Sequence, residues 1–117
     1  MGKLTTHVLD TAHGRPGAGI ALELYRCGNG ARALLGRHVT DADGRCPVPL
    51  LEGDAMVAGQ YELEFRVGEY FARLGLGLPQ PAFLDQVTVR FGIADAAAHY
   101  HVPLLVSPYG YTTYRGS

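Results

Sequence analysis

The sequence has no excess of charge of either sign. It contains 10 lysines and arginines and 11 aspartates and glutamates, which give a formal net charge of −1 at pH 7 with histidine neutral. A protein that holds nucleic acid or lies on an anionic membrane needs a basic surface to neutralise phosphates. The charge balance therefore excludes both kinds of partner, and we expect no nucleic acid and no membrane.

Cysteine is also scarce, because the chain contains only Cys27 and Cys46. Two cysteines are too few for the disulfide framework of a small secreted domain. A bond between them stays open at this stage, but free thiols buried in a protein of a reducing compartment are the simpler interpretation.

Long apolar segments are missing as well. The chain begins Met1-Gly2-Lys3-Leu4-Thr5 and reads as a strand from the start, without the apolar stretch of a signal peptide. No run is long enough for a transmembrane helix, and the last three residues are not a peroxisomal tripeptide. We therefore expect the protein in the cytoplasm, unless a targeting segment has been removed.

The chain does have enough apolar residues for one core. Its 117 residues match the usual size of a domain, and we expect a single domain over residues 1–117. Hydrophobic residues make up 47% of the chain and charged residues 18%. This balance leaves apolar surface to hide, so an oligomer is more expected than for an average chain.

Glycine and proline divide the chain into short alternating runs. The 16 glycines and 7 prolines are spaced as in an all-β sandwich or barrel. Alternation of apolar and polar residues predicts strands over residues 4–11, 18–27, 33–40, 46–51, 60–67, 85–93, 99–107 and 109–115. Helical spacing predicts one short helix over residues 68–75. The pattern favours an all-β fold, a two-sheet antiparallel β-sandwich with Greek-key elements.

Two turn signals separate these runs. Gly28-Asn29-Gly30 predicts a hairpin, because glycine and asparagine tolerate positive φ. Asp41-Ala42-Asp43-Gly44 predicts a second turn directly before Arg45. Its acidic pair also occurs in calcium loops, but the other ligands of an EF-hand are missing, so a plain turn is favoured. Pro47 and Pro49 limit the pairing of the short strand that follows and place it at a sheet edge.

Histidines occupy the outer positions of two predicted strands. In residues 99–107 the apolar, inward set is Tyr100, Val102, Leu104 and Val106. His101 and Leu105 then point outward, and in residues 4–11 the inward Val8 sends His7 and Leu9 outward too. Leucines beside outward histidines indicate a covered surface. In so small a domain the cover has to be another subunit.

The end of the chain is unusually rich in functional residue types. Residues 109–117 contain three tyrosines and Arg115, and they stop at Ser117. Chain ends are usually polar and frayed, so this one is predicted to form part of a site.

Each of these residues also has a simpler interpretation, without any functional role. Taken alone, each histidine or Arg45 is an ordinary surface residue, and the tyrosines are common in strands. A metal site is a further alternative, with His99 and His101 one strand period apart and His7 as a third ligand. That spacing is generic, and no carboxylate is evident beside it.

Taken together, several stretches resemble one family, the 5-hydroxyisourate hydrolases, which are transthyretin-related enzymes of urate breakdown. The stretches that carry the resemblance are Leu4-Thr5-Thr6-His7-Val8-Leu9-Asp10-Thr11, Gly14-Arg15-Pro16, Asp43-Gly44-Arg45, Tyr61-Glu62-Leu63, Arg90-Phe91-Gly92-Ile93, His99-Tyr100-His101-Val102-Pro103-Leu104-Leu105 and Tyr114-Arg115-Gly116-Ser117. The likeness covers essentially the whole chain. Its last stretch is the most specific, because transthyretins carry neither that ending nor the histidine pattern.

The resemblance implies a transthyretin-like (prealbumin-like) β-sandwich of two four-stranded sheets with one short helix. It implies a homotetramer, a dimer of dimers, with active sites between subunits. The implied reaction is hydrolysis of 5-hydroxyisourate to 2-oxo-4-hydroxy-4-carboxy-5-ureidoimidazoline, in purine degradation. The family's catalytic residues fall on His7, Arg45, His101 and Ser117, and its substrate-binding residues on His7, Arg45 and Tyr114. No metal and no other cofactor is implied.

The residue types suit this chemistry. Opening the ring requires a base near neutral pH, a group that stabilises an oxyanion, and a proton for the leaving nitrogen. A neutral histidine is the natural base, and arginine offers fixed donors and permanent charge. The sequence does not choose between His7 and His101, and Ser117 could act through its hydroxyl or its terminal carboxylate. The alternative function is a non-enzymatic carrier of small molecules, of transthyretin type.

Overall fold

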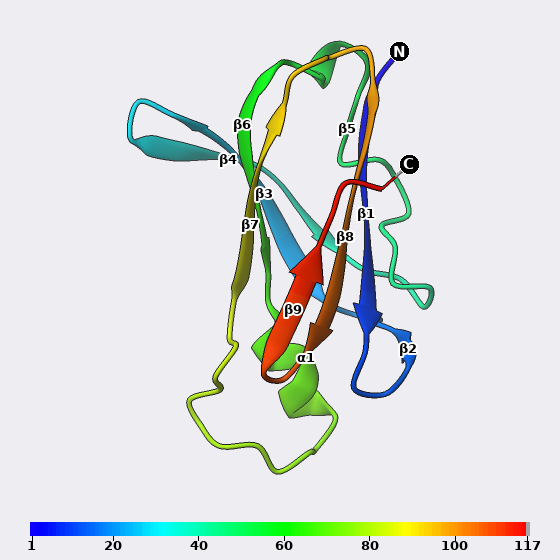
Figure 1. The fold of residues 1–117 in the computed structure, drawn as a ribbon, viewed down its shortest axis with the longest axis vertical. Helices are drawn as coiled ribbons and strands as arrows, with labels where there is room; N and C mark the ends of the chain where they lie inside the picture. The colour runs from blue at the N-terminus through cyan, green and yellow to red at the C-terminus, as the bar shows by residue number, and fades with distance from the viewer. Residues whose placement is uncertain (117) are drawn as a thin grey trace.

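The computed structural model describes residues 1–116, which form two β-sheets packed face to face (Figure 1). The elements in chain order are β1 (Lys3–Asp10), β2 (Arg15–Pro16), β3 (Ala21–Gly28), β4 (Ala31–Val39), β5 (Leu51–Glu52), the 3-10 turn η1 (Gly53–Ala55), β6 (Gly59–Phe65), α1 (Val67–Arg73), β7 (Val87–Ile93), β8 (His99–Ser107) and β9 (Gly110–Thr113). This arrangement confirms the predicted sandwich with one short α-helix.

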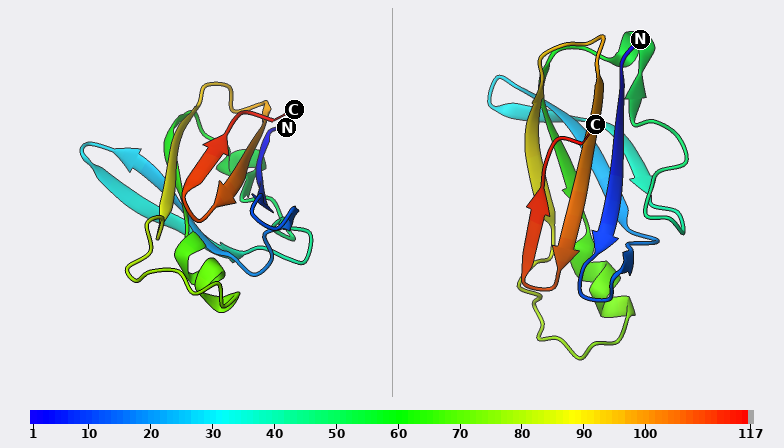
Figure 2. Two further views of the ribbon diagram at one scale, coloured as in Figure 1. Left: turned by 60° about the horizontal axis from the view of Figure 1, so that its bottom comes forward. Right: turned by 45° about the vertical axis from the view of Figure 1, so that its right-hand side comes forward.

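The two sheets are built from strands that mostly follow one another in space as well as in sequence. One sheet has the order β2-β1-β8-β9, with β5 also paired to β1, and the other has the order β4-β3-β6-β7. In the right-hand view of Figure 2, β9, β8 and β1 lie side by side in front of the other sheet, with α1 at one end of the sandwich. The 7-residue α1 is short, and within residues 1–116 no helix has the length and apolar character to cross a bilayer.

The prediction of a purely antiparallel sandwich is wrong for one pair of strands. β1 and β8 run parallel, with Thr5 opposite His101 and His7 opposite Pro103. Alternation within a strand carries no information about the direction of a partner that lies far away in the sequence. Here the intervening chain is long enough for the crossover that a parallel pair needs. The sheet also has five strands where four were expected, because β2 and β5 each add two residues along β1.

The predicted strand over residues 46–51 is mostly loop. Only β5 pairs with β1, through Leu51 opposite Leu4, while Pro47 and Pro49 lie in the preceding irregular segment. Proline lacks the N–H that a ladder requires, which explains the late start of pairing. The predicted strand over residues 60–67 is likewise shorter than expected, because α1 already begins at Val67.

The core lies between the inner faces of the two sheets and confirms the alternation. Along β1 every second residue is buried, and the intervening residues are half-buried. The largest side chains that are fully enclosed are Tyr61, Phe65, Leu4, Ile20, Leu22, Leu24, Leu63, Ile93, Leu104, Val8, Val67 and Val87. Because these residues claim the inner face, the side chains at Thr5, His7 and His101 are left on the outer face of β1 and β8.

The outer face of the other sheet is covered by its own charges. A guanidinium nitrogen of Arg32 lies 2.9 Å from a carboxylate oxygen of Glu64 and 3.2 Å from one of Glu62. The carboxylate of Glu23 accepts hydrogen bonds from Arg37 and Arg66. Only 7% of Glu64 is exposed, although it lies on the outer face, because Arg32 lies against it. This sheet therefore needs no further cover, unlike the sheet that carries the histidines.

A buried carboxylate ties the end of β1 to α1. The side chain of Asp10 is fully buried and accepts hydrogen bonds from the Tyr70 hydroxyl (2.7 Å), the His13 ring (2.7 Å) and two backbone N–H groups. Burial alone raises the pKa of this carboxyl, but the bonds from Tyr70 and His13 outweigh it and hold the pKa below 3.8. Because the folded pKa is depressed, the stabilisation is present above the unfolded pKa and is lost as pH falls through the folded pKa.

Tyr70→Phe should test this junction. We expect the free energy of unfolding at pH 7 to fall by about 1–3 kcal/mol, because a charged acceptor loses one buried donor. The difference from the parent should shrink in acid, where Asp10 becomes protonated. Urea unfolding at both pH values measures it, and Tyr25→Phe is the matched control because Tyr25 donates to the carboxylate of Glu23, which also accepts from Arg37 and Arg66. An equal loss in the two variants would contradict the role given to Asp10.

Candidate active site

Four residues line up across the histidine-bearing sheet. The backbone of Arg45 pairs with His7 on one side of β1, and the backbone of Gly116 pairs with His101 on the far side of β8. The parallel register of β1 and β8 puts His7 and His101 two residues apart on the same outer face. Arg45, His7 and His101, which the sequence predicted as one site, therefore come together within a single chain.

A rigid turn delivers Arg45 to this position. One carboxylate oxygen of Asp41 accepts from the backbone N–H groups of Asp43 (2.9 Å) and Arg45 (3.1 Å). Gly44 has a φ of +76°, and a side chain there would collide with the carbonyl of Val8. The turn predicted over Asp41-Ala42-Asp43-Gly44 is thus confirmed, and its glycine allows the chain to close against β1.

His7 has a defined tautomer. Its Nε2 lies 2.9 Å from the carbonyl oxygen of Asp43. A carbonyl oxygen can only accept, so Nε2 carries the hydrogen and donates it. In neutral His7 the basic lone pair is therefore on Nδ1, the nitrogen that points away from Asp43.

His101 is held in a different way. Its Nδ1 lies 2.8 Å from the hydroxyl of Thr5, the residue directly opposite on β1. Burial, followed by the charge of Arg45 and the proximity of His7, lowers the pKa of His101 below 6.5. This lowered pKa favours the neutral ring, and within residues 1–116 Nε2 of His101 forms no hydrogen bond.

The backbone of Gly116 closes the other side of His101. Its N–H donates to the His101 carbonyl at 2.8 Å. A Cβ atom on Gly116 would lie 2.5 Å from Cδ2 of the imidazole ring and 3.2 Å from its Cγ. The segment that follows β9 bends across β8 to reach this position (Figure 1). Glycine is required here because the ring and the backbone are in direct contact.

The other C-terminal residues are placed differently. Tyr114 is 56% exposed and borders a hollow of about 240 Å³ at the β7–β9 edge, together with Tyr100 and Arg115. The guanidinium of Arg115 lies 4.1 Å from the centre of the Tyr100 ring and donates to the carbonyl of His99. Within one chain Tyr114 is thus not brought to the histidines. Ser117 lies outside the described residues.

The structure gives little support to a cysteine nucleophile or to the alternative of a metal site. Burial, with a contribution from the Asp41 carboxylate, raises the pKa of Cys46 to about 11, so this thiol stays protonated and is a poor nucleophile. Cys27 and Cys46 are both free. His99 is exposed, and within residues 1–116 no three His, Cys, Asp or Glu side chains cluster as metal ligands would.

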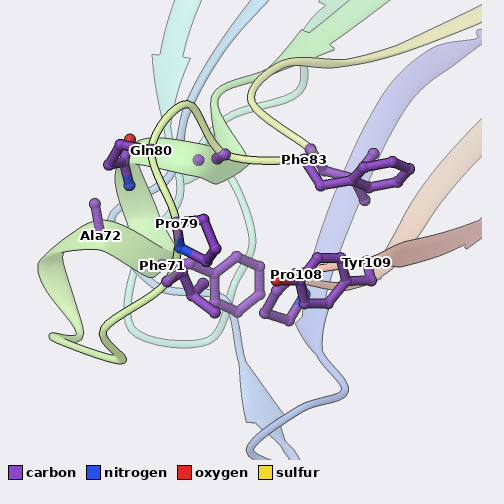
Figure 3. Close-up of a pocket in the computed structure, with 11 residues that line it drawn as sticks. Phe71, Ala72, Pro79, Gln80, Phe83, Pro108 and Tyr109 are labelled. Carbon is purple, nitrogen blue, oxygen red and sulfur yellow. The ribbon is translucent and has the colours of Figure 1, made fainter.

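A separate pocket lies between α1, residues 78–84 and the β8–β9 turn (Figure 3). Phe71 and Pro108 line it, and the rings of Phe83 and Tyr109 lie side by side at its rim, 5.8 Å apart. The space inside is about 10 Å³, the room of one water molecule, and no histidine, carboxylate or arginine lines it. It therefore offers no hydrolytic chemistry.

Sequence reasoning missed three contributors to the histidine site: Thr5, Asp43 and Gly116. Alternation already places Thr5 on the outer face with His7, so that signal was available. The bond from His7 to the carbonyl of Asp43 was not predictable, because it depends on how the turn docks against β1.

Comparison with known proteins identifies relatives over the full chain. Residues 4–116 match the model of the HIUase/Transthyretin family. A 5-hydroxyisourate hydrolase of Ralstonia nicotianae is 61% identical over 117 residues, which cover 100% of both chains.

Solved structures share the fold. A Klebsiella pneumoniae 5-hydroxyisourate hydrolase superimposes with a TM-score of 0.82 at 34% identity, with 100% of both chains covered. An (S)-allantoin synthase superimposes with a TM-score of 0.94 at 46% identity, but this chain covers only 44% of that longer protein and 99% of its own length. Sea bream transthyretin in complex with thyroxine superimposes with a TM-score of 0.86 at 29% identity, over 97% of this chain and 94% of that one. These matches confirm the expected sandwich architecture.

Proposed function

The chain belongs to the HIUase/Transthyretin family and is a 5-hydroxyisourate hydrolase, and we propose that it opens the substrate ring at the surface formed by His7, Arg45 and His101. The observation that carries this proposal is the register across the sheet. Arg45 is paired with His7, and His7 lies two residues along from His101 on the neighbouring strand. A base, a fixed cation and a second imidazole thus share one face.

His7 takes the role of general base in this proposal. Its Nε2–H is engaged by Asp43, which leaves the Nδ1 lone pair to accept a proton from water. The water oxygen forms a bond to the acyl carbon of the ring, and the C–N bond of the ring breaks. The proton held on Nδ1 then passes to the leaving nitrogen, so protons balance without a second acid.

Arg45 and His101 act on the substrate. Arg45 is exposed, its backbone pairs with His7 and its charge acts on His101, so its guanidinium supplies donors and charge to the developing oxyanion. His101, which is neutral, turns its Nε2 toward the same space and holds a substrate group. No thiol is needed, in keeping with the raised pKa of Cys46.

Arg45→Met tests the oxyanion role. We expect kcat to fall by about 10²- to 10³-fold, as when one preorganised donor to an oxyanion is removed. The kcat of Arg45→Lys should lie between that of the parent and that of Arg45→Met, because lysine keeps the charge but lacks the paired donors of the guanidinium. The assay is the ultraviolet decay of freshly generated 5-hydroxyisourate, and Arg26→Met, near the β3–β4 hairpin, is the control. A parent-like kcat for Arg45→Met would overturn the proposal.

The proposed assembly is a homotetramer, a dimer of dimers, with the sites between subunits. Supporting it, Leu9 and Leu105 flank the histidines on the outer face, and Tyr111 and Tyr114 are exposed near the chain end. A neighbouring subunit over this face would exclude water from the imidazoles. In this proposal Tyr114 contacts substrate in the assembled protein.

Three further proposals complete this picture of the enzyme. Ser117, outside the described residues, contributes to catalysis as the resemblance implies. The enzyme acts as one domain over residues 1–117. We place it in the cytoplasm, and the free thiols of Cys27 and Cys46 suit a reducing compartment.

A carrier role like that of transthyretin fits the site less well. The sea bream protein of the same fold was solved with thyroxine bound. In this chain a ligand bound at the histidine face would cover the polar side chains of His7, Arg45 and His101. Removing water from these groups without replacing their hydrogen bonds costs free energy, which disfavours an apolar ligand. Thyroxine binding without any acceleration of 5-hydroxyisourate decay would reverse this ranking.

A further inference from the structure

We propose that Thr5 is a positioning residue that fixes His101 as a neutral Nε2–H donor toward the substrate, and so divides the work between the two histidines. The inference rests on the proposed function, because it assumes that His101 faces substrate. It adds a residue to the site and assigns each imidazole a distinct role, His7 as acceptor of a proton and His101 as donor of a hydrogen bond.

The geometry of Thr5 sets this assignment. Thr5 lies directly opposite His101 in the parallel ladder, and both side chains stand on the outer face. The distance between the Thr5 hydroxyl oxygen and Nδ1 of His101 is 2.8 Å, typical of a hydrogen bond that involves a hydroxyl. The contact therefore follows from strand register and is not an accident of a mobile side chain.

The direction of this hydrogen bond follows from the available acceptors. Within the described part of the chain, the Thr5 hydroxyl forms no hydrogen bond other than the one with Nδ1 of His101. A hydroxyl that donates to Nδ1 satisfies both groups, whereas an Nδ1–H donor would leave the hydroxyl hydrogen without a protein acceptor. Thr5 thus donates, Nδ1 holds the lone pair, and the hydrogen of neutral His101 is on Nε2.

The surroundings of His101 support a neutral ring. Arg45 and His7 are the charged or titratable groups that face it, and both disfavour a second positive charge. A threonine behind the ring cannot stabilise an imidazolium as a carboxylate would. On the opposite side, the backbone of Gly116 lies against Cδ2 and limits rotation of the ring. Thr5 and Gly116 together hold one orientation and one tautomer.

The direct test is the protonation state of His101 by nitrogen-15 NMR on histidine-labelled parent protein near neutral pH. We expect an unprotonated Nδ1 and a protonated Nε2 for His101, and the same tautomer for His7, whose Nε2 donates to the carbonyl of Asp43. In Thr5→Val, the preference of His101 should be lost, while Thr5→Ser should keep it. A parent His101 with its hydrogen on Nδ1 would overturn the proposal without any reference to activity.

Kinetics supply the second test. Loss of one net hydrogen bond predicts a kcat about 10-fold lower for Thr5→Val, with a smaller change in KM and recovery of most activity in Thr5→Ser. Thr88→Val, an exposed strand threonine on β7, is the matched control. Parent-like kcat in Thr5→Val would exclude a positioning role if His7→Asn and His101→Ala still show a strongly lowered kcat. If those two variants are also fully active, the proposed function itself fails.

Discussion

Replacing His7 with asparagine is expected to lower kcat by about 10²- to 10⁴-fold, the usual contribution of a general base. The variant loses the basic nitrogen and the bond of 2.9 Å from Nε2 to the carbonyl of Asp43. The turn stays docked on β1 through the backbone N–H of Val8, which donates to the carbonyl of Gly44 at 2.8 Å. A loss in kcat with a melting temperature close to that of the parent would separate chemistry from folding.

His99→Asn is the matched control for this experiment. His99 begins β8, two residues before His101, and its side chain is exposed. A cofactor-free hydrolase should tolerate this change with nearly parental kcat. A metal site built on His7, His99 and His101 would instead lose activity in both variants and would respond to chelation. Equal losses in His7→Asn and His99→Asn would thus contradict the base role of His7.

The sequence predicted the faces of the strands better than their partners. Alternation is a local property, and the competition of apolar side chains for the core is enough to send His7 and His101 outward. Strand direction depends on distant segments, so the parallel pairing of β1 and β8 was not visible. This matters for the site, because the parallel register is what puts Thr5, and not His7, directly opposite His101.

The hydrogen-bonded partners of the histidines illustrate a second limit. The turn at Asp41–Gly44 was predictable from its residue types, but its contact with His7 depends on tertiary docking. The tautomers follow from such contacts, since one imidazole faces a carbonyl and the other a hydroxyl. The sequence could therefore nominate both histidines as the base but could not distinguish them.

The two sheets also show why the site lies on one face of the sandwich. On the β4-β3-β6-β7 sheet, Glu23 and Glu64 are neutralised by arginines of the same sheet and are nearly buried. On the other sheet the outer face carries imidazoles and leucines, with Arg45 as the nearby cation. Imidazole as a side-chain type can take up and release protons in neutral solution, whereas a carboxylate bridged by arginine stays ionised. This contrast supports placing the proposed site on the face of β1 and β8.

Gly116→Ala is expected to reduce kcat by about 10²-fold or more, close to the effect of removing His101 itself. An alanine Cβ at this position would lie 2.5 Å from Cδ2 of His101, so the ring has to rotate. Rotation breaks the bond of 2.8 Å to Thr5 and turns Nε2 away from the substrate. Gly116 lies beyond β9 near the chain end, outside the core, so the global stability should change little.

A double-mutant cycle decides whether Gly116 acts through His101. If the alanine methyl acts by displacing the imidazole, adding Gly116→Ala to His101→Ala should cost no further activity, because no ring is left to displace. Gly28→Ala is the matched control, since a Cβ there has open space around it. Independent, additive losses in the cycle would show that the terminal segment contributes in another way. If no further activity is lost, the backbone at Gly116 acts by holding the imidazole of His101 in place.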